Sequence, residues 1–216
     1  MTVLNLYAGI GGNRKLWEDV EATAVENNEQ IACVYKSLFQ SDKVIVYDAH
    51  QFLLDHANEF DFVWSSPPCQ SHSRMVKATR HDIRKYPDMV LYQEIIWLKH
   101  FHKGLWVVEN VKPYYEPLIP PTAIIGRHYF WSNFKILPFK SENIKGFIDS
   151  TDSPEGLRSM KEWLGLSFDG NIYYDGNHSP EQVLRNAVHP EIGKHVMDCA
   201  LNKVKSYTKQ KTLFNE

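Results

Sequence analysis

The first 110 residues alternate short apolar runs with segments of helical periodicity, and this alternation constrains the fold most. It predicts buried strands over 3–8, 22–27, 43–48, 60–66 and 105–110, and helices over 13–20, 29–39 and 88–101. Strands that alternate with helices build a mostly parallel sheet covered on both faces. We therefore expect an α/β fold whose ligands bind at the carboxyl ends of the strands.

The second half of the chain has a different character. Residues 124–137 predict a strand hairpin, 138–185 are rich in Gly, Ser, Asp, Asn and Pro around one short helix, and a helix is expected over 190–206. The 216 residues include 43% hydrophobic and 23% charged side chains, which excludes disordered and fibrous classes. No run approaches the ~18 apolar residues that a membrane span requires.

The three cysteines indicate the compartment. Cys33, Cys69 and Cys199 are far apart and lack CxxC spacing, which argues against disulfides and zinc clusters. The first residues also lack the charged and apolar regions of a signal peptide, so we expect a cytoplasmic protein. Cys33 and Cys199 lie in apolar helical patterns and are expected in the core, whereas His72 and His102 are expected at the surface.

Charge is unevenly distributed along the chain. The net charge of −2 argues against a wholly basic nucleic-acid binder. Residues 71–86, however, hold Arg74, Lys77, Arg80, Arg84 and Lys85 against the single acidic residue Asp82. A positive segment on an acidic body can meet phosphate locally. The alternative interpretation is a solvated loop.

Residues able to bind a nucleotide follow the first three predicted strands. The GIGG turn after the first strand lets a ligand approach the backbone closely. Glu26 ends the second strand, where nucleotide crevices place a carboxylate on ribose hydroxyls. Asp48 ends the third strand, in a position to accept a hydrogen bond from an adenine amino group. A tight turn, a helix cap or a surface charge would explain each feature on its own.

A thiol and a carboxyl group follow the next two strands. Cys69 lies in SSPPCQSHS, where two prolines fix the backbone ahead of it, and a stabilised thiolate there can act as a nucleophile. Glu109 ends an apolar strand, and partial desolvation raises the proton affinity of a carboxyl group. The pair suits attack on an electron-poor heterocycle. Taken alone, Cys69 is better explained as an inert core residue.

The motifs LNLYAGIGG, VWSSPPCQSHS, WVVENV, GRHYFWSNF and RNAVHPEIG follow one another in this order. In these segments the chain resembles the DNA (cytosine-5) methyltransferases, and it looks like a small bacterial or phage-type member with a reduced target-recognition region. The resemblance covers residues 1–135 and 183–206. It implies a Rossmann-like S-adenosylmethionine-dependent methyltransferase, with a catalytic and cofactor-binding domain of residues 1–137 plus 186–216. Residues 138–185 would form a small, irregular target-recognition lobe.

The resemblance also implies roles for particular residues. Cys69 would add to carbon 6 of a flipped cytosine, Glu109 would contact nitrogen 3, and Arg127 would contact the carbonyl oxygen. The site for S-adenosylmethionine would comprise Tyr7, Ala8, Gly9, Gly11, Gly12, Glu26, Asn27, Asp48, Ala49, Pro67, Asn186 and Ala187. DNA contacts would come from Gln70, Ser73, Arg74, Lys77, Arg80, Arg84 and Lys85.

The implied activity is that of a DNA (cytosine-5-)-methyltransferase acting on double-stranded DNA, without a metal and away from membranes. Such an enzyme would belong to a restriction-modification system with a separately encoded endonuclease. The sequence departs from the family pattern at Asn5, where Asp is common, at Tyr7, where Phe is usual, and around Arg127, the one Arg left in its motif. The alternatives are an RNA cytosine-5 methyltransferase and a non-catalytic DNA-binding protein of the same fold.

Overall fold

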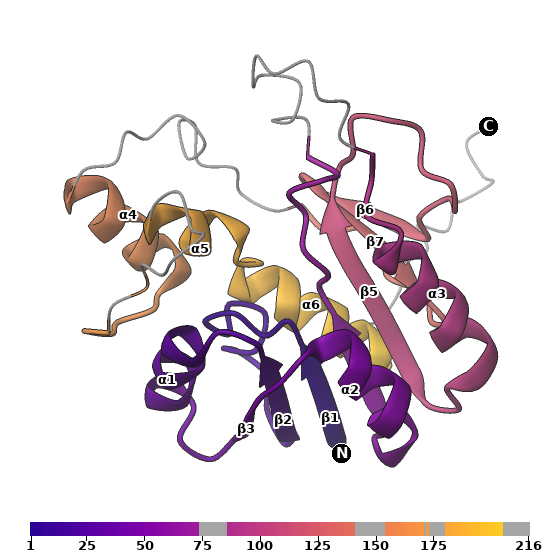
Figure 1. Ribbon diagram of the computed structural model, residues 1–216, viewed down its shortest axis with the longest axis horizontal. Helices are drawn as coiled ribbons and strands as arrows, with labels where there is room; N and C mark the ends of the chain where they lie inside the picture. The colour runs from indigo at the N-terminus through magenta and orange to yellow at the C-terminus, as the bar shows by residue number, and fades with distance from the viewer. Residues whose placement is uncertain (74–85, 141–153, 171, 173–179, 205–216) are drawn as a thin grey trace, which may run out of the picture.

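The computed structural model describes residues 1–73, 86–140, 154–170, 172 and 180–204. Their strands form one seven-stranded sheet of order β3-β2-β1-β4-β5-β7-β6 (Figure 1). The five strands from β3 to β5 in this order are parallel, and β7 is antiparallel to both of its neighbours. The mostly parallel sheet predicted from the sequence is therefore confirmed. Its strands are β1 (Thr2–Leu6), β2 (Glu21–Glu26), β3 (Lys43–Val46), β4 (Phe62–Ser65), β5 (Leu105–Val111), β6 (Ala123–Ile125) and β7 (His128–Ser132).

Side-chain caps set where several helices begin. The Asn28 side chain accepts a 3.1 Å hydrogen bond from the backbone N–H of Ile31 and caps α1. Asp48 caps α2 in the same way through Gln51, at 2.7 Å. The helices are α1 (Glu29–Leu38), α2 (Ala49–His56), α3 (Val90–Phe101), α4 (Pro154–Leu164), α5 (Pro180–Asn186) and α6 (Pro190–Ala200), with the 3₁₀ turn η1 (Ala57–Glu59) after α2.

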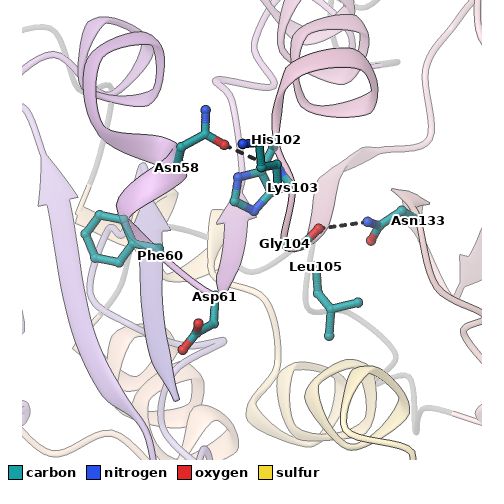
Figure 2. A pocket seen from close by; sticks show the side chains of 8 residues that line it. All are labelled: Asn58, Phe60, Asp61, His102, Lys103, Gly104, Leu105 and Asn133. Carbon is teal, nitrogen blue, oxygen red and sulfur yellow. Dashed lines mark hydrogen bonds between the residues drawn. The ribbon is translucent and has the colours of Figure 1, made fainter.

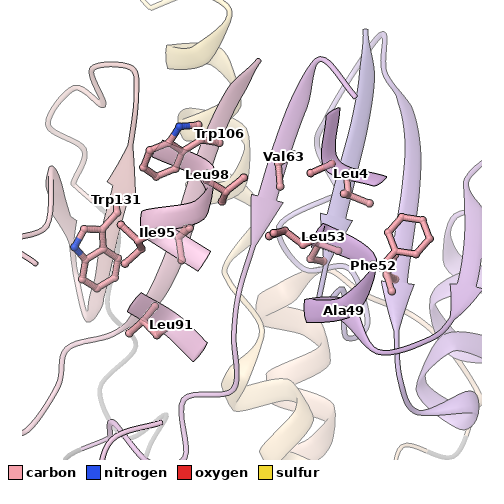
Figure 3. Close-up of a cluster of buried hydrophobic side chains, with 14 of the residues drawn as sticks. Leu4, Ala49, Phe52, Leu53, Val63, Leu91, Ile95, Leu98, Trp106 and Trp131 are labelled. Atoms are coloured by element: carbon pink, nitrogen blue, oxygen red, sulfur yellow. The ribbon is translucent and has the colours of Figure 1, made fainter. Parts of the chain in front are cut away.

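Alternation along the strands divides the core between the two faces of the sheet. In β5, Trp106 and Val108 join one apolar cluster while Val107 joins another. Helices α2 and α3 cover the first face, where Leu53 and Leu98 have no exposed surface (Figure 3). Helix α6 covers the second face and buries Val196 against the strands (Figure 1). Because both faces are covered, ligands reach the sheet at its edges and strand ends.

The described part of residues 138–185 packs against α1. Met160 and Leu164 of α4 share an apolar cluster with Ile31 and Val34 of α1. Leu184 of α5 belongs to the same cluster and is fully buried. The division into a catalytic domain and a recognition lobe stays a prediction. Helix α4 of the proposed lobe shares a hydrophobic cluster with α1 of the proposed catalytic domain.

Two predicted helices are wrong in part. No helix forms over residues 13–20: two successive turns end at Trp17 and the chain to residue 20 is irregular, because Arg14 is held by Asp42 at 2.8 Å and Trp17 donates to the carbonyl of Gly193 at 3.1 Å. These buried tethers replace the regular hydrogen bonds of a helix. The last predicted helix stops at Ala200 instead of residue 206, because Asn202 adopts a left-handed φ of 55° that ends it.

Three surface and core predictions are also wrong. Cys33 is exposed, since the buried face of α1 consists of Ile31, Ala32, Val34 and Tyr35. His72 is 1% exposed and His102 8%, so both belong to the interior rather than to the surface. Cys199 is buried as expected.

Candidate active site

The PPCQ and ENV motifs meet because adjacent strands end at different heights. Strand β4 stops at Ser65, whereas β5 continues to Val111 and pairs beyond Val108 with β7. Glu109 and Asn110 thus lie level with the loop that leaves β4. Asn110, 2% exposed, donates its side-chain N–H to the carbonyl of Pro67 at 2.9 Å. This bond ties the loop carrying the thiol to the strand carrying the carboxyl group.

Cys69 begins a tight turn in that loop. Its carbonyl accepts hydrogen bonds from the backbone N–H groups of His72 and Ser73, at 3.0 and 2.9 Å. The side chain is half-buried. Burial raises the pKa of the Cys69 thiol to about 11, the charge of Glu109 acts in the same direction, and Arg127 lowers it. In the protein without ligands the thiol is therefore protonated near neutral pH.

Arg127 reaches this site from the β6–β7 hairpin. The hairpin loop consists of Gly126 and Arg127, and Gly126 has a φ of 57°, which glycine adopts without strain. The Arg127 guanidinium donates to His128 Nε2 at 3.3 Å and to the carbonyl of Arg185. Burial lowers the pKa of Arg127, while the charges of Glu109 and Cys69 raise it.

His128 links Glu109 to Arg127, a role that no sequence pattern predicts. Its Nδ1 donates to Glu109 Oε1 at 2.6 Å, and both side chains are nearly buried. Because Nε2 accepts from Arg127, the hydrogen-bond pattern assigns the Nδ1–H tautomer. The antiparallel register that pairs His128 with Val111 brings it to Glu109. Only a correct guess of that register would have found it.

Asn186 and Ala187 return to the site from far along the chain. Asn186 ends α5, and its side-chain oxygen lies 3.8 Å from Cys69 Sγ. Ala187 lies against Gly12, where an added Cβ would be 3.1 Å from the Ala187 methyl and 2.5 Å from the carbonyl of Val188. The segment resembling the last family motif therefore contacts both the thiol and the glycine-rich turn.

The glycine-rich turn leaves open space beside Gly9. No atom of the described chain lies within 4 Å of a Cβ built on Gly9, whose φ is 53°. Beneath it, Glu26 accepts from the N–H groups of Gly9 and Asn28 at 3.0 and 2.9 Å. Burial raises the pKa of Glu26, and these N–H groups lower it. The backbone N–H of Asn27 also acts on Glu26, so three N–H groups leave one acceptor position of the carboxylate for a further donor such as a ribose hydroxyl.

Other predicted cofactor residues have packing roles. Gly11 has a φ of 77°, and a Cβ there would lie 2.3 Å from the Phe39 ring, so backbone conformation and packing both favour glycine. Ala8 and Ala49 are buried in apolar clusters, which leaves only their backbones to contact a ligand. Tyr7 and Asp48 lie at the ends of β1 and β3, and Asn27 is exposed beside Glu26.

Few of the predicted DNA contacts can be placed. Gln70 is exposed next to Cys69, and Ser73 forms an isolated bridge with Pro113. Arg74, Lys77, Arg80, Arg84 and Lys85 lie outside the described residues. In the part of the chain that is described, no three His, Cys, Asp or Glu side chains gather as metal ligands. No helix there is long and apolar enough to cross a bilayer.

A hollow of about 460 Å³ lies at the other end of the strands from Cys69. Figure 2 shows the side chains that line it. Asp61 immediately precedes β4 and Leu105 begins β5, so the hollow lies at the amino ends of parallel strands. Cys69 and Glu109 belong to the carboxyl ends. The hollow is therefore separate from the candidate site. Its lining consists of Asn58, Phe60, Asp61, His102, Lys103, Gly104, Leu105 and Asn133.

Comparison with known proteins bears on the fold and on the family. A methyltransferase from Entamoeba histolytica, EhMeth, superposes with a TM-score of 0.53 at 14% identity, over 95% of this chain and 99% of that one. DNMT2 from Spodoptera frugiperda, solved as a triple mutant, is 28% identical over 51% of this chain, with a TM-score of 0.36. The match spans 35% of the DNMT2 chain, about a third of its length. No curated protein sequence matches the chain.

The fold is that of a Rossmann-like S-adenosylmethionine-dependent methyltransferase, as expected. Residues 1–116, more than half of the chain, match the model of the C-5 cytosine-specific DNA methylases. The chain belongs to this C-5 cytosine-specific DNA methylase family. Fold and family together imply methylation that depends on S-adenosylmethionine.

Proposed function

We propose that the protein transfers a methyl group from S-adenosylmethionine to carbon 5 of cytosine in double-stranded DNA, with Cys69 as the covalent nucleophile. The observation that carries the proposal is the convergence of Cys69, Glu109 and Arg127. They come from two loops and a strand, and hydrogen bonds through His128 and Asn110 join these segments. The open space beside Gly9 lies at the same edge of the sheet.

The chain's own groups account for each step. The Cys69 thiol loses its proton to solvent, and the thiolate forms a bond to carbon 6. The π-electron pair of the carbon 5–carbon 6 bond is thereby displaced through the ring toward nitrogen 3, where Glu109 holds the base. Arg127 stabilises charge on the carbonyl oxygen. When bound, S-adenosylmethionine would supply an electrophilic methyl group to carbon 5 and would leave as S-adenosylhomocysteine. Solvent takes up the carbon 5 proton, its electron pair re-forms the carbon 5–carbon 6 double bond, and Cys69 leaves as a thiolate, which restores the aromatic ring. The base must leave the duplex for this chemistry.

The finer parts of the proposal concern DNA recognition. The basic residues of 74–85 would contact the backbone, and the 138–185 lobe would read a short sequence. Within that lobe, Lys161 donates to the carbonyl of Phe168 at 2.8 Å and is less available to a base than the exposed Lys140 and Arg158. We further propose a cytoplasmic restriction-modification role with a separate endonuclease.

Trapping tests the proposal directly. Wild-type protein should form an SDS-resistant adduct with duplex DNA containing 5-fluorocytosine, because fluorine cannot leave as the carbon 5 proton does. Cys69→Ser should form none and should lose methyl transfer by several orders of magnitude while still binding cofactor. Cys33→Ser, which changes an exposed cysteine on α1, is the matched control and should behave as wild type.

Normal methylation by Cys69→Ser would refute the covalent mechanism. A parallel reaction with RNA of the same sequence separates the alternative substrate, since an adduct and methyl transfer confined to RNA would exclude DNA. Bisulfite sequencing of DNA from cells expressing the chain alone would then give the target sequence.

A further inference from the structure

Glu94 is a buried carboxylate that the proposed reaction leaves unused. It lies on α3 with no exposed surface. Three donors converge on it, with Tyr7 Oη at 2.6 Å and His50 Nδ1 at 3.0 Å from Oε1, and Ser65 Oγ at 2.5 Å from Oε2. The donors come from the end of β1, the first turn of α2 and the end of β4.

The donors match what an ionised carboxylate needs. A buried charge is costly unless it is paired and hydrogen-bonded, and a carboxylate accepts bonds at both oxygens. The hydrogen bond to Glu94 raises the pKa of His50, its burial lowers it, and the charges of Glu94, Asp48 and Asp88 raise it further. A protonated His50 thus compensates the buried charge. The Tyr7 hydroxyl is the remaining group at Oε1.

Each donor lies next to a segment of the proposed active site. Tyr7 has a left-handed φ of 54°, which is strained for a bulky residue and must be held by its surroundings. It leads directly into the turn that carries Gly9. His50 follows Asp48 by two residues, and Ser65 precedes the loop of Cys69. One carboxylate therefore links the ends of β1 and β4 to the first turn of α2.

We propose that Glu94 is a positioning residue that holds Tyr7 and His50 in the geometry that binds S-adenosylmethionine. The inference rests on the proposed function and extends it to a residue that does not itself touch the cofactor. It also predicts a pH dependence. Affinity falls as pH rises through the pKa of His50, because loss of the imidazolium leaves the Glu94 charge without its counter-ion.

The variants Glu94→Gln and Tyr7→Phe test this inference. Glu94→Gln keeps the shape but removes the charge, and should weaken S-adenosylmethionine binding about 10-fold, since charge-assisted bonds are the stronger ones. Calorimetry across a pH series should show that the cofactor affinity of Glu94→Gln, unlike that of the wild type, does not fall as pH rises through the pKa of His50. In turnover assays KM for the cofactor should rise by a larger factor than kcat falls. Tyr7→Phe removes one donor and should have a smaller effect, less than additive in the double variant.

Glu59→Gln is the matched control. It breaks a chemically similar pair, His56 to Glu59 at 2.8 Å, which is solvent-exposed and away from the strand ends, and cofactor affinity should stay at the wild-type value. Wild-type affinity in a folded Glu94→Gln protein would overturn the inference and leave the proposed function intact. If Glu94→Gln does not fold, Tyr7→Phe decides, and unchanged affinity in it is equally fatal. A wild-type protein that binds no S-adenosylmethionine would instead refute the proposed function.

Discussion

At the scale of single residues, the neighbours of Cys69 have opposing effects on the pKa of its thiol. Burial and the Glu109 carboxylate raise its pKa, and Arg127 lowers it. The two charged groups are themselves linked through His128. A residue that must become a thiolate is therefore kept protonated until the site changes. We expect DNA binding to supply that change by bringing a base between the thiol and the carboxylate.

The reactivity of Cys69 tests this interpretation. In a Cys33→Ser background, alkylation of Cys69 by iodoacetamide should rise about tenfold per pH unit from pH 8 to 10, as a pKa of about 11 requires. Glu109→Gln should speed alkylation at each pH, because a negative charge is removed, while it slows methyl transfer. Peptide mass spectrometry would follow the alkylation of Cys69 in both proteins, and a methyl-transfer assay would follow activity. An alkylation rate that levels off below pH 9 would contradict the raised pKa.

At the scale of elements, a buried chain of hydrogen bonds anchors the loop after Cys69. His72 Nδ1 lies 2.5 Å from Tyr115 Oη, which accepts from Tyr92 Oη at 3.1 Å. The backbone N–H of Leu118 in turn donates to the Tyr92 hydroxyl at 3.2 Å. Burial lowers the pKa of His72 and raises that of Tyr115, so both groups are neutral. The catalytic loop, the segment after β5 and helix α3 are joined by uncharged groups.

Removing one hydroxyl from this chain should loosen the loop. Tyr115→Phe leaves His72 Nδ1 buried without its partner, which costs about 1–3 kcal/mol of unfolding free energy. Urea unfolding would measure the loss. Methyl transfer should fall while S-adenosylmethionine affinity stays within twofold, because the cofactor segments are untouched. Tyr86→Phe, at a tyrosine that is 78% exposed, is the control. Equal stability of the two variants would argue against the anchor.

At the scale of the whole molecule, helix α6 packs against the segment that follows the glycine-rich turn. A Cβ on Gly193 of α6 would lie 2.1 Å from the carbonyl oxygen of Asn13. The carbonyl of Gly193 accepts from Trp17 Nε1 at 3.1 Å. The same region of the chain places Val188 against Gly12. The first and last parts of the described chain therefore form one side of the site together.

A methyl group at this contact should separate the two parts. Gly193→Ala meets backbone, which cannot rotate away, so we expect a loss of about 1–3 kcal/mol of stability. Cofactor affinity should fall with it, since the turn carrying Gly9 shifts. Lys194→Ala changes the adjacent, half-exposed residue of α6 and should be neutral for binding. Thermal unfolding and calorimetry measure both effects. Unchanged affinity in Gly193→Ala would show that α6 is not needed to hold the turn.

Local signals along the chain correctly predict the parallel strands and place Glu26, Asp48 and Cys69 at or just beyond strand ends, whereas Glu109, predicted at a strand end, lies inside the longer β5. Alternation of apolar residues and turn-forming residues act locally, so a single pass along the chain reads them correctly. The same local signals predicted a helix over 13–20, and there the buried tethers of Arg14 and Trp17 to distant partners prevailed.

The contacts between distant residues of the site follow only from how the elements pack. Tyr7 and Glu94 are 87 positions apart, and Cys69 and Asn186 are 117 apart, so no local pattern relates them. His128 reaches Glu109 only through the antiparallel register of β7. His72 and Glu94 are polar residues in apolar surroundings, where a hydrogen bond has to compensate for burial. Whether that bond exists depends on which elements pack together, and packing is a property of the folded chain as a whole.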